Sequence, residues 1–296
     1  MTVVRPPSVV RLSAISLSSR ISWLLDHALR GSIIATFSRS CYIELDGRII
    51  AVVGAELLNG PLNLIVALPS GATLIDVPIG AAAEVRGRVL EIAGRWHVDA
   101  ALAQLWNPRL TPIVPAPGLG QQLASIQAVL DADAPQESLA RAEGRPRRAT
   151  DGMVRLATAL RRGDVALAGR AAHDLAGLGP GLTPSGDDVL AGTLLAVALL
   201  GPAHADRFRE SITTSVRGRT TRISEAYLEA AAAGEAGEAW HRLLIILRRD
   251  AKTVPSPPQG ETELRDAVQR ILAFGETSGA DMLAGFLLAM TALRPA

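Results

Sequence analysis

The sequence lacks the residues on which several common chemistries depend. Its single cysteine, Cys41, excludes an intramolecular disulfide and a zinc site built from cysteines. Aromatic residues make up 3% of the 296 residues, so few flat side chains are present on which nucleic-acid bases stack. The hydrophobic content of 48% is mainly aliphatic, and it is sufficient for a sizeable core.

A strong net charge is also absent. The chain has 30 basic and 29 acidic residues, whereas nucleic-acid-binding proteins usually have a concentrated basic surface. The longest apolar runs, such as residues 189–200, contain Gly and Thr and are too short to span a bilayer. The N-terminus has no continuous apolar segment typical of a signal peptide. We therefore expect a soluble, cytoplasmic protein that binds neither nucleic acid nor membrane.

The first part of the chain has the pattern of a β-rich domain. Short runs rich in β-branched residues alternate with turn sequences such as Asp46-Gly47 and Asn59-Gly60-Pro61. This spacing predicts a small barrel or sandwich, with an amphipathic helix around residues 18–30. The predicted strands are 33–37, 41–45, 49–53, 62–68 and 85–92.

Four prolines between residues 108 and 117 mark the end of the β-rich part. Proline fixes φ and removes a backbone donor, so this density is typical of a domain boundary. Beyond it, apolar residues recur with helical spacing. We therefore predict an α+β protein, with a β-rich domain at 1–117 and an all-helical domain at 118–296.

The helical part is predicted to contain nine helices and a loop at residues 253–260. The predicted helices are 121–130, 152–161, 165–176, 187–200, 207–217, 223–233, 236–249, 261–274 and 280–293.

An internal repeat lies within the helical part. Residues 185–196 read SGDDVLAGTLLA and residues 278–289 read SGADMLAGFLLA, and nine of the twelve aligned positions are identical. The agreement indicates two equivalent helix starts, for which we expect a pseudo-twofold axis. Gly192 and Gly285 would let the two helices approach closely.

A structural interpretation accounts for part of this repeat. Ser-x-x-Asp before an apolar run is a capping box, in which Ser185 would cap one helix with Asp188 and Ser278 would cap the other with Asp281. Acidic residues in a first turn also favour the helix dipole.

The glycines before the first repeat need another explanation. Residues 177–188 read GLGPGLTPSGDD, and capping requires only one or two such residues. Extra glycines allow a backbone to approach a ligand closely, and amides before a helix N-terminus bind anions. We predict a ligand-binding loop here; a tight structural connection is the alternative. The predicted ligand-binding residues are Gly177, Gly179, Gly181, Thr183, Ser185, Gly186, Thr220, Thr221, Arg222, Ser278 and Gly279.

The adjacent carboxylates of Asp187 and Asp188 would repel an anion. Three arrangements resolve the conflict: a divalent cation such as Mg²⁺ bound by both, a ligand with an amino or carbamoyl donor, or a carboxylate used for capping. If the two halves of the repeat face each other, Asp281 supplies a third carboxylate. Asp187, Asp188 and Asp281 are the candidate catalytic residues, and Asp187 and Asp188 the candidate metal ligands.

Better-known phosphate and nucleophile motifs are absent. The P-loop pattern is not present, and the only lysine, Lys252, lies far along the chain from the glycines. The preceding segment has a helical pattern, which disfavours a dinucleotide-binding fold. The G-x-S-x-G nucleophile motif is also missing.

The string GLGPGLTPSGDD with the following LAG resembles the signature of the AllH-like family. The Thr-Thr-x-x-Ser segment at 220–224 and the SGxDxLxG element at 278–285 extend the resemblance. It implies a subunit of an oxamate carbamoyltransferase of anaerobic allantoin breakdown, part of purine catabolism. That enzyme exchanges a carbamoyl group between oxamate and phosphate, giving carbamoyl phosphate, and has two partner subunits.

On this resemblance, the glycine loop would hold the phosphate of a small anionic substrate, and Asp187 or Asp188 would accept a hydrogen bond from the carbamoyl NH₂ group. Arg170, Arg219 and Arg222 would balance the anion. The alternative is a non-catalytic subunit that binds a metabolite or regulates a multi-subunit complex.

Overall fold

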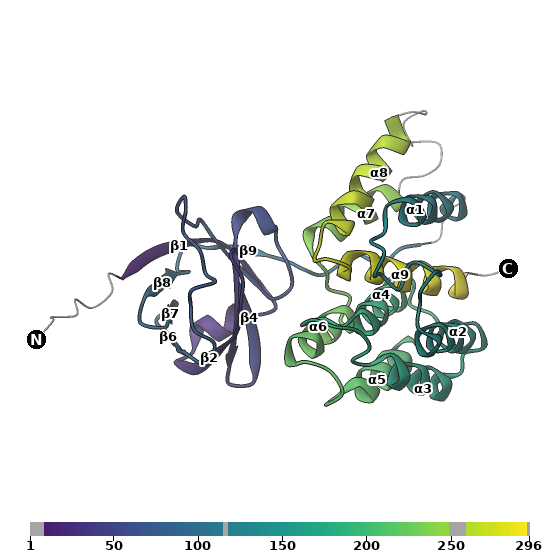
Figure 1. The fold of residues 1–296 in the computed structure, drawn as a ribbon. Helices are drawn as coiled ribbons and strands as arrows, with labels where there is room; N and C mark the ends of the chain where they lie inside the picture. Colours follow the sequence, from purple (N-terminus) through teal and green to yellow (C-terminus); the bar gives the residue numbers. More distant parts are fainter. Residues whose placement is uncertain (1–8, 115–117, 249–258, 295–296) are drawn as a thin grey trace, which may run out of the picture. The chain divides into compact units, whose positions relative to one another are not determined.

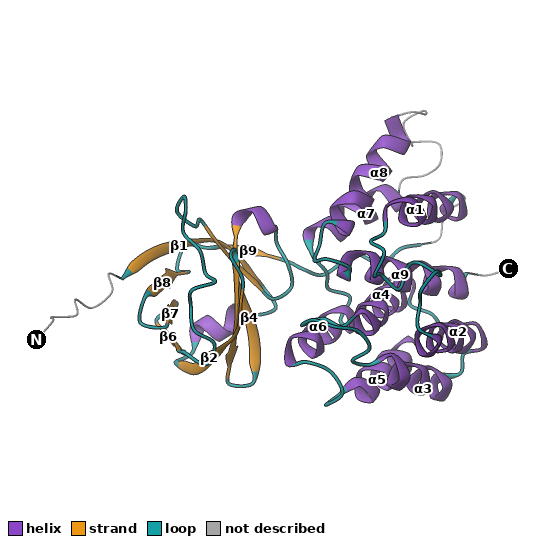
Figure 2. Cartoon of the chain, viewed as in Figure 1, coloured by secondary structure: helices purple, strands orange, loops and turns teal. Residues whose placement is uncertain are grey.

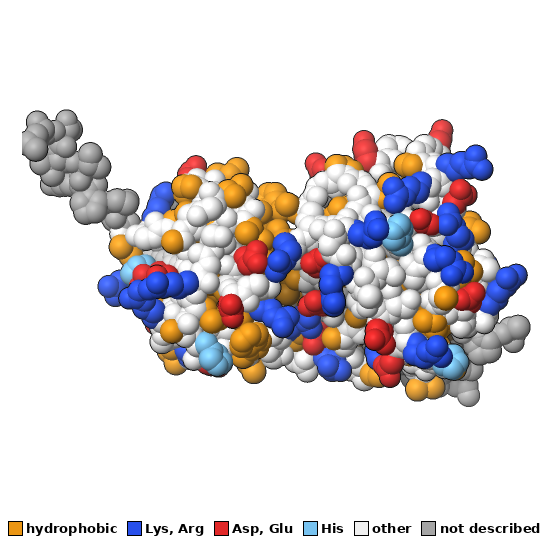
Figure 3. Space-filling model, turned by 90° about the horizontal axis from the view of Figure 1, so that it is seen from below, with side chains coloured by type: hydrophobic (Ala, Val, Ile, Leu, Met, Phe, Trp, Pro, Cys, Tyr) orange, Lys and Arg blue, Asp and Glu red, His pale blue; other side chains and the backbone are white. Residues whose placement is uncertain are grey.

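The computed structural model describes residues 9–114, 118–248 and 259–294, and the chain forms two compact units, Met1–Pro108 and Arg109–Ala296 (Figure 1). The first unit contains the strands and the second contains the α-helices, so the α+β class predicted from the sequence is confirmed (Figure 2). On the face drawn in Figure 3, basic and acidic side chains are interspersed on each unit.

The first unit is a β-sheet that closes on itself. Its strand order is β5-β4-β3-β2-β6-β7-β8-β1-β9, and an additional antiparallel pairing of β5 with β1 closes the sheet into a barrel. Ile43, Ile50 and Leu64 are among the fully buried core residues. The strands are β1 (Val10–Ser18), β2 (Leu29–Thr36), β3 (Ser40–Leu45), β4 (Arg48–Gly54), β5 (Asn63–Val66), β6 (Ala82–Arg86), β7 (Val89–Ile92), β8 (Trp96–Asp99) and β9 (Gln104–Trp106).

Two of the local predictions in this unit were wrong. The helix expected at residues 18–30 is only a short 3-10 helix at Ser22–Asp26, because β1 and β2 extend into this range and hydrogen-bond to neighbouring strands. The single strand expected at 85–92 is a hairpin of β6 and β7. Gly87 and Arg88 both have positive φ, which is the backbone of a two-residue hairpin turn.

The second unit contains nine α-helices among its described residues, at the positions predicted from the sequence. None of these helices is long and apolar enough to cross a bilayer. Of the loop predicted at 253–260, residues 253–258 lie outside the described residues, and the last two positions begin α8. The helices are α1 (Leu119–Asp133), α2 (Arg147–Arg162), α3 (Val165–Leu175), α4 (Ser185–Leu200), α5 (Ala205–Val216), α6 (Arg222–Ala232), α7 (Glu238–Leu247), α8 (Gln259–Leu272) and α9 (Ser278–Leu293).

Helices α4 and α9 form the centre of this unit, with the other helices around them (Figure 1). A Cβ atom on Gly192 would lie 1.8 Å from the carbonyl oxygen of Met282, and one on Gly285 would lie 1.9 Å from that of Val189. Gly192 and Gly285 are counterparts in the repeat, and so are Val189 and Met282. Such reciprocal contacts are the signature of a twofold relation. The backbones therefore touch at a local pseudo-twofold axis.

The same relation extends to the helices that precede α4 and α9. A Cβ atom on Gly186 would lie 2.0 Å from the carbonyl oxygen of Leu175, at the end of α3. One on Gly279 would lie 1.9 Å from the carbonyl oxygen of Ile271, near the end of α8. Gly186 and Gly279, predicted to contact a ligand, are thus used for close packing between helices.

We expect Gly192→Ala to lower the free energy of unfolding by about 3 kcal/mol, because the new methyl group overlaps a backbone carbonyl that has no room to move. Gly169→Ala in α3 is the matched control. Its Cβ would crowd the hydroxyls of Ser211 (2.5 Å) and Ser215 (3.1 Å), which can rotate away, and the nearest backbone atom is 3.7 Å away, so we expect a change within about 1 kcal/mol. Chemical denaturation of both variants measures this difference, and equal effects would contradict the backbone contact.

Candidate functional site

The glycine loop connects the end of α3 to the start of α4 and lies at the surface. Gly177, Gly179 and Gly181 are exposed and have φ values of 67°, 113° and 94°. Side chains other than glycine rarely adopt this backbone, so the three glycines are needed for the course of the loop. Residues 185–188, which follow the loop, are buried.

Most backbone amides of the loop are not used within the protein. Leu178 donates to Leu175 (3.0 Å) and Gly186 donates to Leu178 (2.8 Å). Within the described residues, five other amides have no hydrogen-bond acceptor. A Cβ atom on Gly179 would lie 3.0 Å from the nitrogen of one of them, Ser185, so glycine leaves that amide uncovered. The five amides are those of Gly179, Gly181, Leu182, Thr183 and Ser185.

Asp187 is buried behind the loop and fixes it by hydrogen bonds. Its side chain is 1% exposed; one oxygen accepts from the amide of Gly177 (2.9 Å), and the other accepts from the hydroxyls of Thr220 and Ser224 (2.9 Å to Ser224). Burial raises the pKa of Asp187, while these three hydrogen bonds lower it. Both oxygens are thus directed to protein donors, and the carboxylate links the loop to the start of α6.

The threonine cluster forms the second attachment of the loop. Thr221 caps α6 by accepting from the amide of Ser224 (3.0 Å), and its hydroxyl donates to the carbonyl oxygen of Leu182. A Cβ atom on Gly177 would lie 2.4 Å from the carbonyl oxygen of Arg219, so the α5–α6 connection packs directly on the loop. The hydroxyls of Thr220 and Thr221, predicted to bind a ligand, contact the protein itself.

Several arginines lie near this connection at the surface. Arg217, Arg219 and Arg222 are exposed, and Arg222 also forms an ion pair with Glu225 (4.0 Å). Arg170, nominated from the sequence as well, is exposed on α3. The positive charge available to the loop therefore comes from the α5–α6 connection.

The two capping boxes expected from the repeat do not form. The N-cap residues are Pro184 for α4 and Thr277 for α9, and neither accepts a capping hydrogen bond. Ser185 and Ser278 are instead the first helical residues. Because the helix starts lie side by side, each serine faces the acid of the other helix.

These contacts are reciprocal. The hydroxyls of Ser278 and Thr183 lower the pKa of Asp188, and those of Ser185 and Thr277 lower the pKa of Asp281, so each acid is influenced by hydroxyls from both helix starts. The Thr183 and Ser278 hydroxyl oxygens are 2.9 Å apart, and those of Ser185 and Thr277 are 3.4 Å apart. The structure thus brings together predicted residues from both halves of the repeat.

Asp281 has further partners that the sequence did not indicate. One of its oxygens accepts from the hydroxyl of Ser138 (2.7 Å) and the amide of Leu139 (2.6 Å). The positive charge of Arg145 also faces this acid, although burial lowers the pKa of Arg145. Ser138 and Arg145 come from the segment between α1 and α2, which has no motif that predicts them.

The acids at the two helix starts are deeply buried. Asp188 is 5% exposed and Asp281 is 0% exposed. Burial raises the pKa of Asp188 well above its ordinary value, and the charges of Asp281 and Asp187 raise it further. Burial likewise raises the pKa of Asp281. Carboxyl groups in this environment retain a proton at higher pH than solvated ones.

The predicted metal site at Asp187 and Asp188 remains a prediction. Among the described residues, no group of three or more His, Cys, Asp or Glu side chains is arranged to hold a metal ion. The two acids also diverge, because Asp187 faces the start of α6 and Asp188 faces the start of α9.

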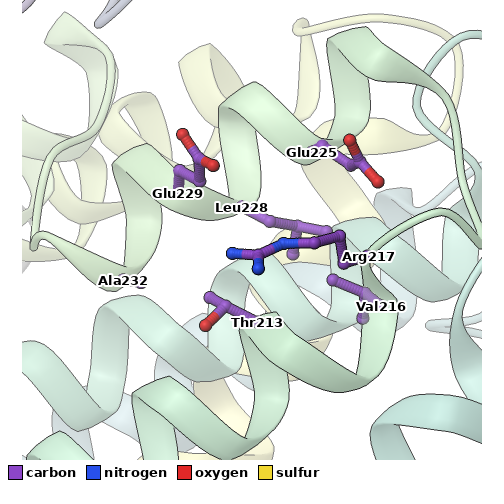
Figure 4. Close-up of a pocket in the computed structure, with 7 residues that line it drawn as sticks. All are labelled: Thr213, Val216, Arg217, Glu225, Leu228, Glu229 and Ala232. Atoms are coloured by element: carbon purple, nitrogen blue, oxygen red, sulfur yellow. The ribbon is translucent and has the colours of Figure 1, made fainter.

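A pocket of roughly 200 Å³ lies between α5 and α6, as Figure 4 shows. Arg217 extends across it, and the adjacent amide of Gly218 donates to Glu225 (2.5 Å). The sequence did not predict this pocket, because its lining residues follow ordinary helical spacing. They are Thr213, Val216, Arg217, Glu225, Leu228, Glu229 and Ala232.

One comparison with known proteins covers this part of the chain. A family model described as oxamate carbamoyltransferase subunit AllH matches residues 175–290. The matched range contains the glycine loop, the threonine cluster and both halves of the repeat. No solved structure matches the chain significantly.

The buried acids make the stability of the protein depend on pH. The pKa of Asp188 is raised in the folded state, so the unfolded chain loses this proton first as the pH rises. We expect the free energy of unfolding of the wild type to fall relative to that of Asp188→Asn, which stays neutral, as the pH rises above about 4, the ordinary pKa of an aspartate in an unfolded chain. Urea unfolding in choline-salt buffers measures the difference.

Asp206→Asn is the control for this measurement, because Asp206 is exposed on α5. Its curve should run parallel to that of the wild type. If the Asp188→Asn curve is also parallel, the carboxyl group is not protonated more readily in the folded state.

Proposed function

We propose that this chain is a subunit of a carbamoyltransferase-type enzyme, because residues 175–290 match the AllH family. Its part in the reaction is to bind phosphate, or the phosphate end of carbamoyl phosphate, at the glycine loop. The second substrate is a small carboxylate or amide such as oxamate. The observation that carries the proposal is the set of five loop amides without an acceptor in the described residues.

The chemistry of these amides suits a phosphate group. They lie before and at the first residue of α4, where the helix dipole adds positive potential. A concave arrangement of successive N–H groups binds anions. Arg219, exposed in the neighbouring connection that packs on Gly177, supplies a full positive charge.

The neighbouring acids do not prevent anion binding. Asp187 is buried beneath the loop, and its charge is compensated by three protein hydrogen bonds. Asp188 is also buried, so its carboxyl group does not lie on the exposed side of the loop. The exposed part of the loop therefore presents amides to the solvent rather than carboxylates.

The loop contributes positioning and charge stabilisation to the reaction. In one direction, the nitrogen of oxamate attacks the carbamoyl carbon, the bond from that carbon to the phosphate oxygen breaks, and phosphate leaves as the nitrogen loses a proton. The amides stabilise the charge that develops on the leaving phosphate. They also fix the orientation of the carbamoyl group.

A non-catalytic role in the same complex is the second candidate. Residues 177–184 contain no ionisable side chain, and Asp187, Asp188 and Asp281 are all buried. These facts favour a subunit that binds the anion while partner subunits supply the reacting groups. The matched family is one of enzyme subunits, which agrees with partner proteins. A cytoplasmic location fits both candidates, since the only cysteine is buried.

We expect phosphate and carbamoyl phosphate to raise the melting temperature of the wild type. In Gly179→Ala, the affinity for both ligands should fall by at least about tenfold. The added methyl group would lie 3.0 Å from the Ser185 nitrogen, and the backbone φ of 113° is unsuitable for alanine. Gly163→Ala is the matched control, because Gly163 also has positive φ (67°) at the end of α2, with no atom near its Cβ. It should lose stability but keep the ligand response.

Turnover then separates the two candidates. With the partner subunits present, phosphate release from carbamoyl phosphate and oxamate is measured for the wild type and Gly179→Ala. A catalytic loop predicts a lower kcat at saturating carbamoyl phosphate, whereas a binding subunit predicts a change in KM alone. If Gly179→Ala binds phosphate and carbamoyl phosphate as tightly as the wild type, the loop is not the binding site.

A further inference from the structure

We propose that the acids and hydroxyls between the starts of α4 and α9 form a site for one monovalent cation. This cation site consists of Asp188, Asp281 and the hydroxyls of Thr183, Ser185, Thr277 and Ser278. It is separate from phosphate binding at the loop amides, and it is tested without phosphate. The chemical class of ligand is K⁺, Na⁺ or NH₄⁺.

The first observation is a pair of unsatisfied atoms. In the described residues, four buried side-chain nitrogen or oxygen atoms have no hydrogen-bond partner, and two of them are the Oδ2 atoms of Asp188 and Asp281. These residues are 5% and 0% exposed, and they are counterparts in the repeat. A buried polar atom without a partner is unfavourable and requires an explanation. A bound cation would satisfy both atoms at once.

The second observation is the surrounding set of hydroxyl groups. Thr183 and Ser278 form one pair of hydroxyls (2.9 Å), and Ser185 and Thr277 form the other (3.4 Å). Each pair joins the start of α4 to the start of α9. Hydroxyl oxygens retain lone pairs for a cation while they donate to a carboxylate. All these donors are oxygens, which hard cations prefer.

The charges indicate a monovalent ion. The charged groups that act on Asp188 are Asp281 and Asp187, and both are acidic. Arg145 supplies one positive charge opposite Asp281. The positive ends of α4 and α9 favour the ionised carboxylates. The oxygens of Asp187 accept from Gly177, Thr220 and Ser224 and take no part in this site. Within the pair of Asp188 and Asp281, one additional positive charge therefore balances the second acid.

A divalent ion fits this site less well. Mg²⁺ usually keeps several of its waters and requires near-octahedral geometry, whereas the unpaired carboxylate oxygens are buried. Ca²⁺ takes six to eight oxygen ligands, usually with several carboxylates. No cluster of three acidic or histidine ligands exists in the described part of the chain.

The first test measures cation-dependent stability in the full chain. We expect K⁺, Na⁺ or NH₄⁺ to raise the melting temperature saturably relative to choline at the same ionic strength and pH, without phosphate. Asp188→Asn and Asp281→Asn should abolish the response. The matched control is Asp187→Asn, because the oxygens of Asp187 face Gly177, Thr220 and Ser224. That variant should be less stable but should still respond.

A second measurement detects the ion directly. Tl⁺, a heavy analogue of K⁺, should remain with the wild-type chain at one equivalent after gel filtration, and it should be lost from Ser278→Ala and Asp281→Asn. Ser278→Ala removes one hydroxyl without altering an acid. It therefore provides a test that remains valid if a substituted acid prevents folding.

Three results would overturn the proposal. The first is a melting temperature that does not change with monovalent cations, together with an Asp188→Asn variant that is as stable as the wild type. This result would show that a shared proton, and not a cation, neutralises Asp188 and Asp281. The second is a response to Mg²⁺ alone. The third is a cation response that persists in both Asn variants. Loss of phosphate binding in Gly179→Ala, with the cation response intact, would affect only the proposal for the loop.

Discussion

The helical unit depends on one contact, the crossing of α4 and α9 at Gly192 and Gly285. Each glycine lies against a backbone carbonyl of the opposite helix, so no side chain separates the two backbones there. This proximity has a direct consequence at the helix starts, where hydroxyl groups from the two halves come within hydrogen-bonding distance of each other, next to the buried acids Asp188 and Asp281. The buried polar cluster is therefore a result of helix packing.

The exposed loop depends in turn on buried acceptors. Asp187 lies at the start of α4, but it accepts hydrogen bonds from the loop and from α6 rather than capping its own helix. Thr221 caps α6 and also holds the carbonyl of Leu182. Because the side chains of Asp187 and Thr221 fix the loop, five of its own amides need no acceptor within the described residues to hold it. A segment whose glycines would allow many backbone conformations is thus held in one of them.

The sequence predicted the helices and the repeat correctly because both depend on periodic apolar residues and short-range spacing. It also predicted the close approach at Gly192 and Gly285. The capping boxes were wrong because Ser-x-x-Asp describes contacts within one helix, whereas the partner of each serine belongs to the other helix. The local pattern has no information about that neighbour.

Other features could not be predicted for similar reasons. Strands β1, β8 and β9 were not predicted, and β1 pairs in parallel with β8 and β9 through residues distant in sequence. Ser138 and Arg145 reach Asp281 from a segment without helical or strand periodicity. The apolar residues at 18–30 suggested a helix, but most of this range is the connection between β1 and β2, which contains only a short 3-10 helix. The local hydrophobic pattern of the sequence does not determine which distant segments pair with each other.

The two halves of the repeat differ in the connection that precedes them. The segment from Leu175 to Ser185 contains the three exposed glycines, whereas the shorter segment from Leu272 to Ser278 contains only Gly275. A twofold arrangement of helices would ordinarily give two copies of any surface feature. Here the unequal connections break the symmetry outside the core, so the loop with three exposed glycines occurs once per chain, and an anion bound there would have a stoichiometry of one per subunit despite the duplicated scaffold.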